Sequence, residues 1–219
     1  MKDLVLLPGW GFDSHVWQPL TRLLEQDFRI QSAIDDLPAG AVVCGWSLGA
    51  LTAMQMALAQ PERIGRLILI GATPRFIQAP DWPHAQPPAL LEEFAKAVAA
   101  DPHIALRRFV ALLNQGDAQA RRLTRELSAL LATDSTEATL AAGLKTLRDT
   151  DLRADVGRIR QPVLLLHGAH DALMPLAAAE WLTNHLPAAR LEVFPDTAHA
   201  PFLAQPERCA ELLRRFAHE

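Results

Sequence analysis

The sequence lacks the features that mark disulfide-rich, membrane-spanning and nucleic-acid-binding proteins. It has two cysteines among 219 residues, too few for a disulfide framework. No apolar run approaches the roughly 18–20 residues of a membrane-spanning helix, and the apolar run 4–7, which Pro8 ends, is too short for a signal peptide. The 21 basic residues do not outnumber the 25 acidic ones, whereas duplex-binding domains carry a basic surplus. We therefore expect a cytoplasmic protein that binds neither a membrane nor nucleic acid.

Apolar residues make up half of the sequence, which is enough for a packed core. A single core accommodates up to roughly 250–300 residues, so one compact unit is expected. Outside the middle of the chain, short apolar runs typical of strands alternate with segments of helical spacing. The strand-like runs are 3–7, 28–31, 41–46, 66–71, 163–167 and 190–194. This alternation predicts an α/β fold with a mostly parallel central sheet flanked by helices.

The middle of the chain shows helical spacing only. Four helices are expected there, at 90–100, 102–114, 118–132 and 137–147. A helical block inserted into such a series is expected to lie over the carboxyl edge of the sheet, where open α/β folds bind ligands. We therefore divide the chain into a first part of the core (1–74), a four-helix lid (75–155) and a second part of the core (156–219).

The strongest chemical signal is Gly45-Trp46-Ser47-Leu48-Gly49, a G-x-S-x-G motif that follows a predicted strand and precedes a predicted helix. The two glycines allow a sharp strand-to-helix turn, because they have no Cβ to clash with neighbouring backbone. The Ser47 hydroxyl is then held at the sheet edge, near the positive end of the helix. Elsewhere the motif could be an ordinary Gly-Ser turn, but in this context it predicts that Ser47 is a nucleophile.

A serine nucleophile needs a base, and the base needs a third group that orients it. For this type of turn the expected chain order is Ser, acid, His. Asp171 follows the strand-like run 163–167, and His199 lies between the last predicted strand and the last predicted helix. We therefore predict the triad Ser47, Asp171 and His199. Asp196 is the alternative acid, although a carboxylate three residues before the histidine more often closes a local turn.

A metal site is the alternative interpretation of the region around Asp171. His167 and His170 lie close to it in sequence, but no distant ligand set has the spacing of a zinc site. We therefore expect no metal and no organic cofactor.

The negative charge that develops during ester cleavage needs backbone N–H donors. We predict two of them: Leu48, which directly follows the nucleophile, and Trp10 in the glycine-rich loop 8–11. A tryptophan in such a loop could instead be a core residue of a simple turn.

Several motifs also point to a family. Gly45-Trp46-Ser47-Leu48-Gly49 and Ala198-His199-Ala200-Pro201-Phe202 are general to α/β-hydrolases, and three segments are narrower. These are Leu-Leu-Pro-Gly-Trp-Gly at 6–11, Asp81-Trp82-Pro83 and Arg107-Arg108-Phe109-Val110-Ala111-Leu112, with His-Asp-Ala-Leu-Met-Pro at 170–175 beside them. Together they resemble the pimeloyl-[acyl-carrier protein] methyl ester esterases of biotin synthesis, which are α/β-hydrolases, over nearly the whole chain.

The resemblance implies hydrolysis of the methyl ester of a pimeloyl chain carried on acyl carrier protein, with release of methanol. The substrate-contacting positions of the family correspond to Trp10, Ser47, Leu48 and His199. Its lid segment that lines the acyl tunnel corresponds to Phe109, Val110, Ala111, Leu112 and Leu113. Helical spacing places Phe109, Val110 and Leu113 on one apolar face, where packing is the simpler interpretation, and Phe109 is the residue that we expect to touch substrate. We expect a monomer.

Five arginines and a single acid, Asp117, lie between residues 107 and 125. Such a charge run is usually a solvated helix face. In the family, lid arginines hold the acidic carrier protein, and Arg108, Arg121 and Arg125 match those positions. The resemblance therefore implies that these three arginines dock the carrier protein.

The chain departs from the family pattern in two places. Pro8 replaces the histidine that commonly precedes the glycine of the oxyanion loop, which leaves the backbone donors intact. The segment 28–41 is short, so the link between two strands is expected to lack a full-length helix. Two alternative functions stay open. One is a small-molecule carboxylesterase or C–C bond hydrolase of the same fold, and the other is a non-catalytic ligand receptor, against which the complete Ser-Asp-His order argues.

Overall fold

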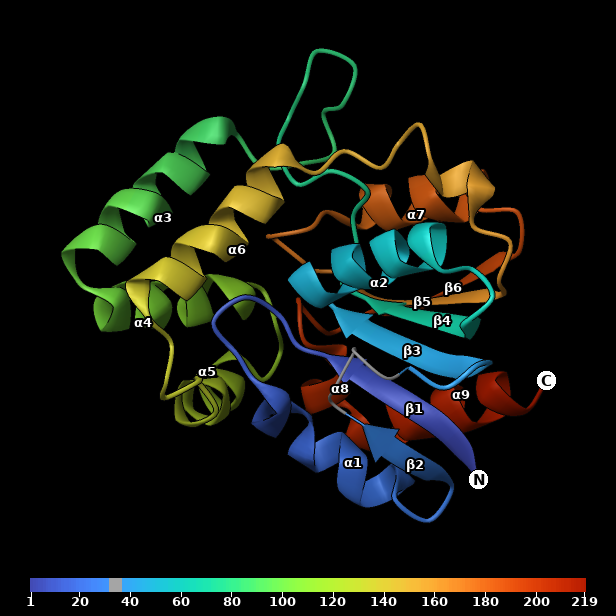
Figure 1. The fold of residues 1–219 in the computed structure, drawn as a ribbon. Helices are drawn as coiled ribbons and strands as arrows, with labels where there is room; N and C mark the ends of the chain where they lie inside the picture. The colour runs from blue at the N-terminus through green and yellow to red at the C-terminus, as the bar shows by residue number, and fades with distance from the viewer. Residues whose placement is uncertain (32–36) are drawn as a thin grey trace.

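The computed structural model describes residues 1–31 and 37–219, which are built around a six-stranded sheet (Figure 1). The strands lie in the order β2-β1-β3-β4-β5-β6, and each neighbouring pair is parallel. Their bounds are β1 (Lys2–Leu7), β2 (Phe28–Gln31), β3 (Ala41–Trp46), β4 (Ile64–Ile70), β5 (Val163–Gly168) and β6 (Ala189–Phe194). Each strand coincides with a strand-like apolar run, so the predicted parallel α/β sheet is confirmed.

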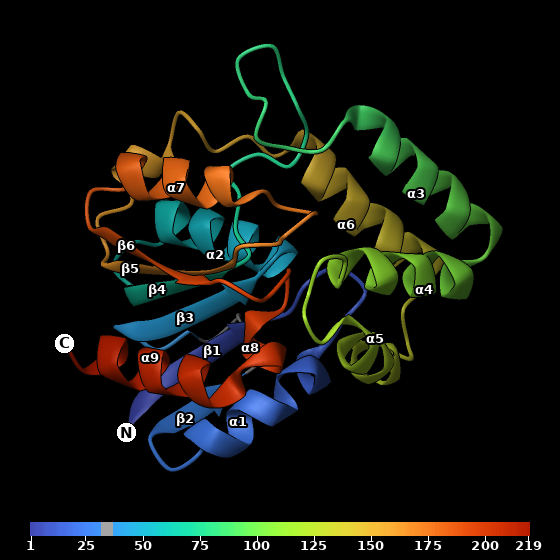
Figure 2. The same ribbon diagram turned by 180° about the vertical axis from the view of Figure 1, so that it is seen from behind.

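Helices cover both faces of the sheet, as Figures 1 and 2 show. On one face lie α2 (Leu48–Ala59) and α7 (Leu176–His185), and on the other lie α1 (Gln18–Leu24) and α9 (Pro206–His218). All residues of β3 and β5 are buried, because these central strands are covered on both sides.

Four helices between β4 and β5 form a group beyond the carboxyl ends of the strands (Figure 1). They are α3 (Pro88–Ala100), α4 (Pro102–Leu113), α5 (Ala120–Ala129) and α6 (Glu137–Asp149). We call residues 75–155 the helical insertion. Within it α3 packs on α4 and α6, and α4 packs on α5. The carboxylate of Asp101 begins α4 by accepting hydrogen bonds from the backbone N–H groups of His103 and Ile104.

One helix of the insertion is shorter than the sequence predicts, and the first helix of the core follows a 3-10 turn. This turn, η1 (Ser14–Trp17), precedes α1, which starts at Gln18 with Pro19 in its first turn. The helix expected over 118–132 ends at Ala129, because Leu131 forms a β-bridge with Phe12 of the core. The short segments α8 (Pro201–Ala204) and η2 (Val156–Arg158) complete the elements. In the described part of the chain, no helix is both long and apolar enough to cross a membrane.

The expected shortened link between β2 and β3 includes residues 32–36, which lie outside the described residues. The two strands that it joins are described, and β1 lies between them in the sheet.

The turn from β3 to α2 passes against the end of β1 without room for a side chain. A Cβ at Gly49 would overlap the carbonyl oxygen of Leu7, and a Cβ at Gly45 would overlap the carbonyl oxygen of Gly49. Gly157, by contrast, has only the His185 carbonyl oxygen near it, 3.9 Å from the position of a Cβ. Glycine is therefore required by packing at 45 and 49 but not at 157.

We expect Gly49→Ala to lower the free energy of unfolding by roughly 1–3 kcal/mol, because the added methyl group forces the turn and β1 apart. The matched control Gly157→Ala is expected to change it by less than about 0.5 kcal/mol. Urea unfolding followed by circular dichroism measures both changes. Equal midpoints for the two variants would contradict this account of the turn.

Candidate active site

Ser47 lies in a strained backbone conformation between β3 and α2. Its φ of 59° and ψ of −118° make it the only non-glycine residue with positive φ in the part of the chain that the structure describes. Such a conformation costs of order 1–3 kcal/mol and persists only where surrounding structure holds it. The Ser47 N–H donates to the carbonyl oxygen of Ile70 at the end of β4, at 2.9 Å. The turn thereby holds Ser47 at the carboxyl edge of the sheet.

Asp171 and His199 form a hydrogen-bonded pair at the same edge. The loop after β5 carries Asp171, the loop after β6 carries His199, and the Asp171 Oδ2 to His199 Nδ1 distance is 2.6 Å. Both side chains are completely buried. The other carboxylate oxygen, Oδ1, accepts hydrogen bonds from the N–H groups of Leu173 (3.0 Å) and Met174 (2.8 Å).

The environment of Asp171 keeps it ionised. Burial alone would raise the pKa of its carboxyl, but the imidazole of His199, that of His167 and the Met174 N–H together hold the pKa below its ordinary value. An ionised carboxylate is the form that accepts from the Nδ1–H of His199 and leaves Nε2 as the basic nitrogen.

The backbone of His199 is held from two sides. The indole Nε1 of Trp46 donates to the His199 carbonyl oxygen at 2.8 Å, and the His199 N–H donates to the carbonyl oxygen of Leu113 in α4 at 3.2 Å. The imidazole packs against Gly71, where a Cβ would lie 2.9 Å from the ring. The Nε2 atom of His199 is buried and has no hydrogen-bond partner among the described residues. Nε2 is therefore the ring nitrogen that we expect to act as the base.

Three further polar side chains hold the two loops, and of these the sequence analysis considered only His167, as a ligand of the alternative metal site. His167 Nε2 contacts the Met174 carbonyl oxygen at 2.7 Å, and Gln86 Nε2 donates to the carbonyl oxygens of Ala172 and Leu173, both at 2.8 Å. In the histidine loop, the Asp117 carboxylate accepts from the Ala198 N–H at 2.8 Å. The signal for His167 is its polarity inside a buried strand. Gln86 and Asp117 carry no comparable local signal.

The structure also places the alternative acid, Asp196, and the alternative metal ligand, His167. The side chain of Asp196 is exposed, and no hydrogen bond between it and His199 is present in the described structure. The ring of His167 lies 3.5 Å from Asp171 Oδ2. Among the described residues, no group of three His, Cys, Asp or Glu side chains is arranged to hold a metal ion.

The two predicted oxyanion donors lie next to each other beside a cavity of about 280 Å³. Leu48 is the first residue of α2, so its N–H belongs to the free donors of a helix N-terminus. Trp10 is buried, and its indole contacts the rings of Phe94 and Phe109, whose centroids lie 5.9 Å and 4.8 Å away. The cavity is lined by the loop 8–12, Leu48 and residues of α6.

The five residues predicted to line an acyl tunnel do not share one environment. Phe109, Val110 and Leu113 are buried on the inner side of α4. Ala111 is exposed and Leu112 is partly exposed, because successive residues of a helix turn by about 100°. The structure therefore brings Phe109, Val110 and Leu113 towards the interior, but not Ala111.

The predicted docking arginines lie on the outside of the helical insertion. Arg108 on α4 and Arg121 and Arg125 on α5 are exposed, and the two helices are in contact. Arg122, which also lies on α5, forms an ion pair with Glu126 at 2.8 Å.

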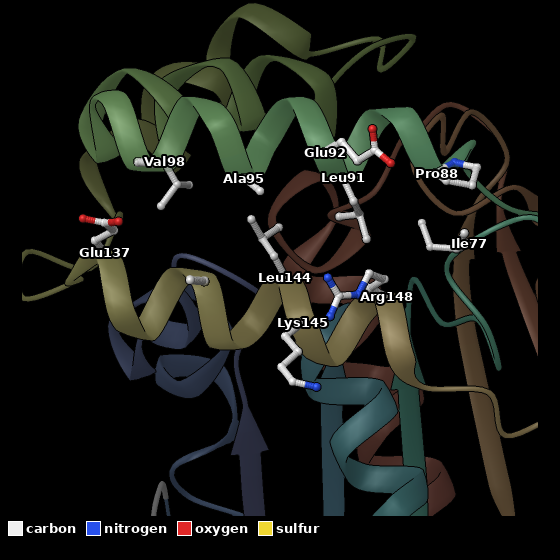
Figure 3. Close-up of a pocket in the computed structure, with 12 residues that line it drawn as sticks. Ile77, Pro88, Leu91, Glu92, Ala95, Val98, Glu137, Leu144, Lys145 and Arg148 are labelled. Carbon is white, nitrogen blue, oxygen red and sulfur yellow. The ribbon is translucent and has the colours of Figure 1, made fainter.

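A separate cavity of about 360 Å³ lies inside the helical insertion, between α3 and α6 (Figure 3). Leu91 and Val98 of α3 and Leu144 of α6 point into it, with Arg148 at one end and Glu137 at the other. None of the predicted triad residues and neither Trp10 nor Leu48 lines this cavity, so it is separate from the site around Ser47.

The chain is similar to known proteins both in sequence and in structure. The family model described as "alpha/beta hydrolase fold" matches residues 29–206. The chain is 44% identical to the pimeloyl-[acyl-carrier protein] methyl ester esterase of Aromatoleum aromaticum, with 96% of each chain covered. It is 39% identical to the enzyme of that name from Nitrosomonas europaea, covering 94% of this chain and 92% of the relative. Among solved structures, an esterase from Exiguobacterium antarcticum has a TM-score of 0.88 at 22% identity, covering 100% and 92% of the two chains, which shows a shared fold.

We expect a fluorophosphonate probe to label Ser47, because an activated serine oxygen displaces fluoride from the phosphorus atom. Asp171→Asn is expected to slow labelling by about 10³- to 10⁴-fold, because the amide no longer orients the imidazole of His199 in the required tautomer. Peptide mass spectrometry locates and quantifies the adduct. Asp196→Asn is the matched control and is expected to react at the wild-type rate. Labelling at a different residue, or an unchanged rate in Asp171→Asn, would contradict the assignment.

Proposed function

The chain belongs to the pimeloyl-[acyl-carrier protein] methyl ester esterase family of α/β-hydrolases, and from this premise we propose that Ser47 is the nucleophile of that ester hydrolysis. The substrate is the methyl ester of a pimeloyl chain on acyl carrier protein, which the names of the relatives state. Hydrolysis of this ester yields the free carboxylate and methanol. The observation that carries the proposal is the buried Asp171–His199 pair at the sheet edge that also carries Ser47.

In the proposed mechanism Ser47 Oγ attacks the ester carbonyl carbon while His199 Nε2 takes its proton. Asp171 stabilises the imidazolium that forms, and the N–H groups of Leu48 and Trp10 donate to the developing oxyanion. The tetrahedral intermediate collapses when His199 returns the proton to the departing methoxide, which leaves as methanol. A water molecule then attacks the acyl-enzyme by the same route and releases the acid.

The contacts of the acyl chain follow from the orientation of α4. We propose that the chain passes Trp10, Phe109, Val110 and Leu113, whose side chains are buried between the helical insertion and the core. The exposed position of Ala111 argues against the tunnel contact that the family resemblance implies for it. The helical insertion acts as the lid of the site in this proposal, since Ser47 and His199 are both buried beneath it.

The carrier protein is proposed to dock on α4 and α5 through Arg108, Arg121 and Arg125. These side chains are exposed, and no ion pair of theirs is present in the described structure, whereas Arg122 is already paired with Glu126. Exposed cations attract an acidic partner over about one Debye length, roughly 8–10 Å at physiological ionic strength.

The purified protein is expected to hydrolyse both pimeloyl-carrier methyl ester and a short-chain p-nitrophenyl ester. Ser47→Ala is expected to lower both rates by about 10⁴-fold or more, because the remaining groups cannot replace the nucleophile. Product formation is followed by mass spectrometry of the carrier and by absorbance of nitrophenolate. The wild-type gene should restore growth of a biotin auxotroph that lacks this esterase, and the Ser47→Ala gene should not. Cleavage of the nitrophenyl ester without cleavage of the carrier ester would favour a general carboxylesterase instead.

The charge reversal Arg121→Glu/Arg125→Glu is expected to lower kcat/KM for the carrier-bound ester by about tenfold or more, because like charges then face the acidic carrier. The rate on a p-nitrophenyl ester should stay unchanged, since that substrate does not touch α5. Steady-state kinetics on the two substrates at low and physiological salt measure the effect. Arg22→Glu/Lys96→Glu makes the same change in net charge at exposed positions away from α5 and is the matched control. A loss as large in the control would show that total charge, rather than this surface, governs binding.

A further inference from the structure

The helical insertion touches both proposed oxyanion residues at one point, Gly143 of α6. A Cβ at Gly143 would lie 2.5 Å from Cδ1 and 3.0 Å from Nε1 of Trp10, and 3.3 Å from Cδ2 of Leu48. The first distance is shorter than carbon atoms of neighbouring side chains tolerate. The Trp10 indole therefore occupies the space that a side chain at position 143 would fill.

A hydrogen bond holds Trp10 in this position. Its indole Nε1 donates to the carbonyl oxygen of Leu140 at 2.8 Å, and Leu140 lies three residues before Gly143 on α6. Residues three apart lie on the same side of a helix, so the indole rests on a single turn of α6. The Trp10 ring also contacts the rings of Phe94 and Phe109 edge to face. A shift of α6 would consequently be transmitted to Trp10.

Neither helix propensity nor backbone conformation explains glycine at this position. Glycine is a poor helix former in the middle of a helix, where α6 places Gly143. Its φ is not positive, so its backbone suits any residue, unlike that of Gly11 or Gly71. Only the close approach of Trp10 and Leu48 remains as a reason.

We propose that Gly143 is a positioning residue for the oxyanion hole. By leaving room for the Trp10 indole and the Leu48 side chain, it lets α6 close onto the core while the backbone N–H groups of both residues keep their direction towards the substrate carbonyl. This inference rests on the proposed assignment of Trp10 and Leu48 as oxyanion donors. It makes the helical insertion a contributor to transition-state stabilisation in addition to covering the site.

The test is the variant Gly143→Ala, assayed with a p-nitrophenyl ester. Removal of a complete oxyanion donor costs about 10²- to 10³-fold in kcat. Because the methyl group displaces both donors without removing either, we expect kcat to fall by roughly 10- to 100-fold with KM within twofold of the wild type. The affinity for a trifluoromethyl ketone, which forms a tetrahedral adduct with the serine, should fall by the same factor as kcat/KM. The thermal unfolding midpoint should fall by no more than a few degrees, because the helix preference of alanine offsets part of the cost of the close contact.

Two further variants separate positioning from a general disturbance of α6. Ala142→Ser adds one heavy atom at the neighbouring exposed position of the same helix and should leave kcat within twofold. In a Trp10→Phe background the smaller ring leaves space for the methyl group, so Gly143→Ala should then cost less than about threefold. This double variant also keeps the test valid if Gly143→Ala alone fails to fold.

Each other outcome overturns the inference. A folded Gly143→Ala enzyme with wild-type kcat would show that Gly143 does not position the donors, while the esterase assignment would stand. A rise in KM with unchanged kcat would show that the methyl group blocks the substrate cavity instead. An equal loss in the wild-type and Trp10→Phe backgrounds would exclude action through Trp10. If the wild-type protein itself did not cleave the ester, the proposed function would fail and this inference with it, whereas the three outcomes above overturn the inference alone.

Discussion

The site depends on one buried interaction, the hydrogen bond between Asp171 and His199. Removing a carboxylate from water carries a penalty of several kcal/mol, which only a well-placed partner and further hydrogen bonds offset. Here the offset comes from the imidazole of His199 and from the Leu173 and Met174 N–H groups. Each of these donors belongs to a loop at the carboxyl edge of the sheet. The loops after β5 and β6 therefore have to be fixed in place for the pair to form. The geometry of the rest of the site depends on this requirement.

Residues of the helical insertion, as well as residues of the core, fix these loops in place. The N–H of His199 donates to Leu113 of α4, and the Asp117 carboxylate between α4 and α5 accepts from Ala198. At the loop after β1, the Trp10 indole donates to the carbonyl oxygen of Leu140 of α6. The insertion thus contacts the loop of the proposed base, His199, and the loop of a proposed oxyanion donor, Trp10. Movement of these helices would change the geometry of the reacting groups as well as access to them.

Features whose cause is local could be predicted from the sequence. β1, β4, β5 and β6 are apolar runs that end at or next to a glycine or proline. Ser47, the proposed nucleophile, lies in a motif whose two glycines are required by contacts within a few residues and with β1. The order Ser, acid, His then singled out Asp171 and His199 among many acids and histidines, because parallel strands bring the ends of β3, β5 and β6 to one edge.

Prediction was poorer where tertiary contact outweighed local preference. The helix expected to reach residue 132 ends at Ala129, because Leu131 pairs with Phe12. Ala111, which the family resemblance places beside the acyl chain, is exposed on α4, and its contact with substrate stays a prediction.

The sequence by itself determined the sheet, the strained turn at Ser47 and the identity of the residues that can carry ester hydrolysis, because these depend on the periodicity of apolar residues, on glycine and on chain order. Only the tertiary structure decided which polar groups hold those residues in place. Gln86 reaches Ala172 across 86 residues, Asp117 reaches Ala198 across 81, and Trp10 reaches Leu140 across 130. The space beside Gly143 likewise exists only because α6 and the loop after β1 meet. Contacts of this kind leave no pattern along the chain, since each partner is ordinary in its own segment and acquires its role only when the segments pack together.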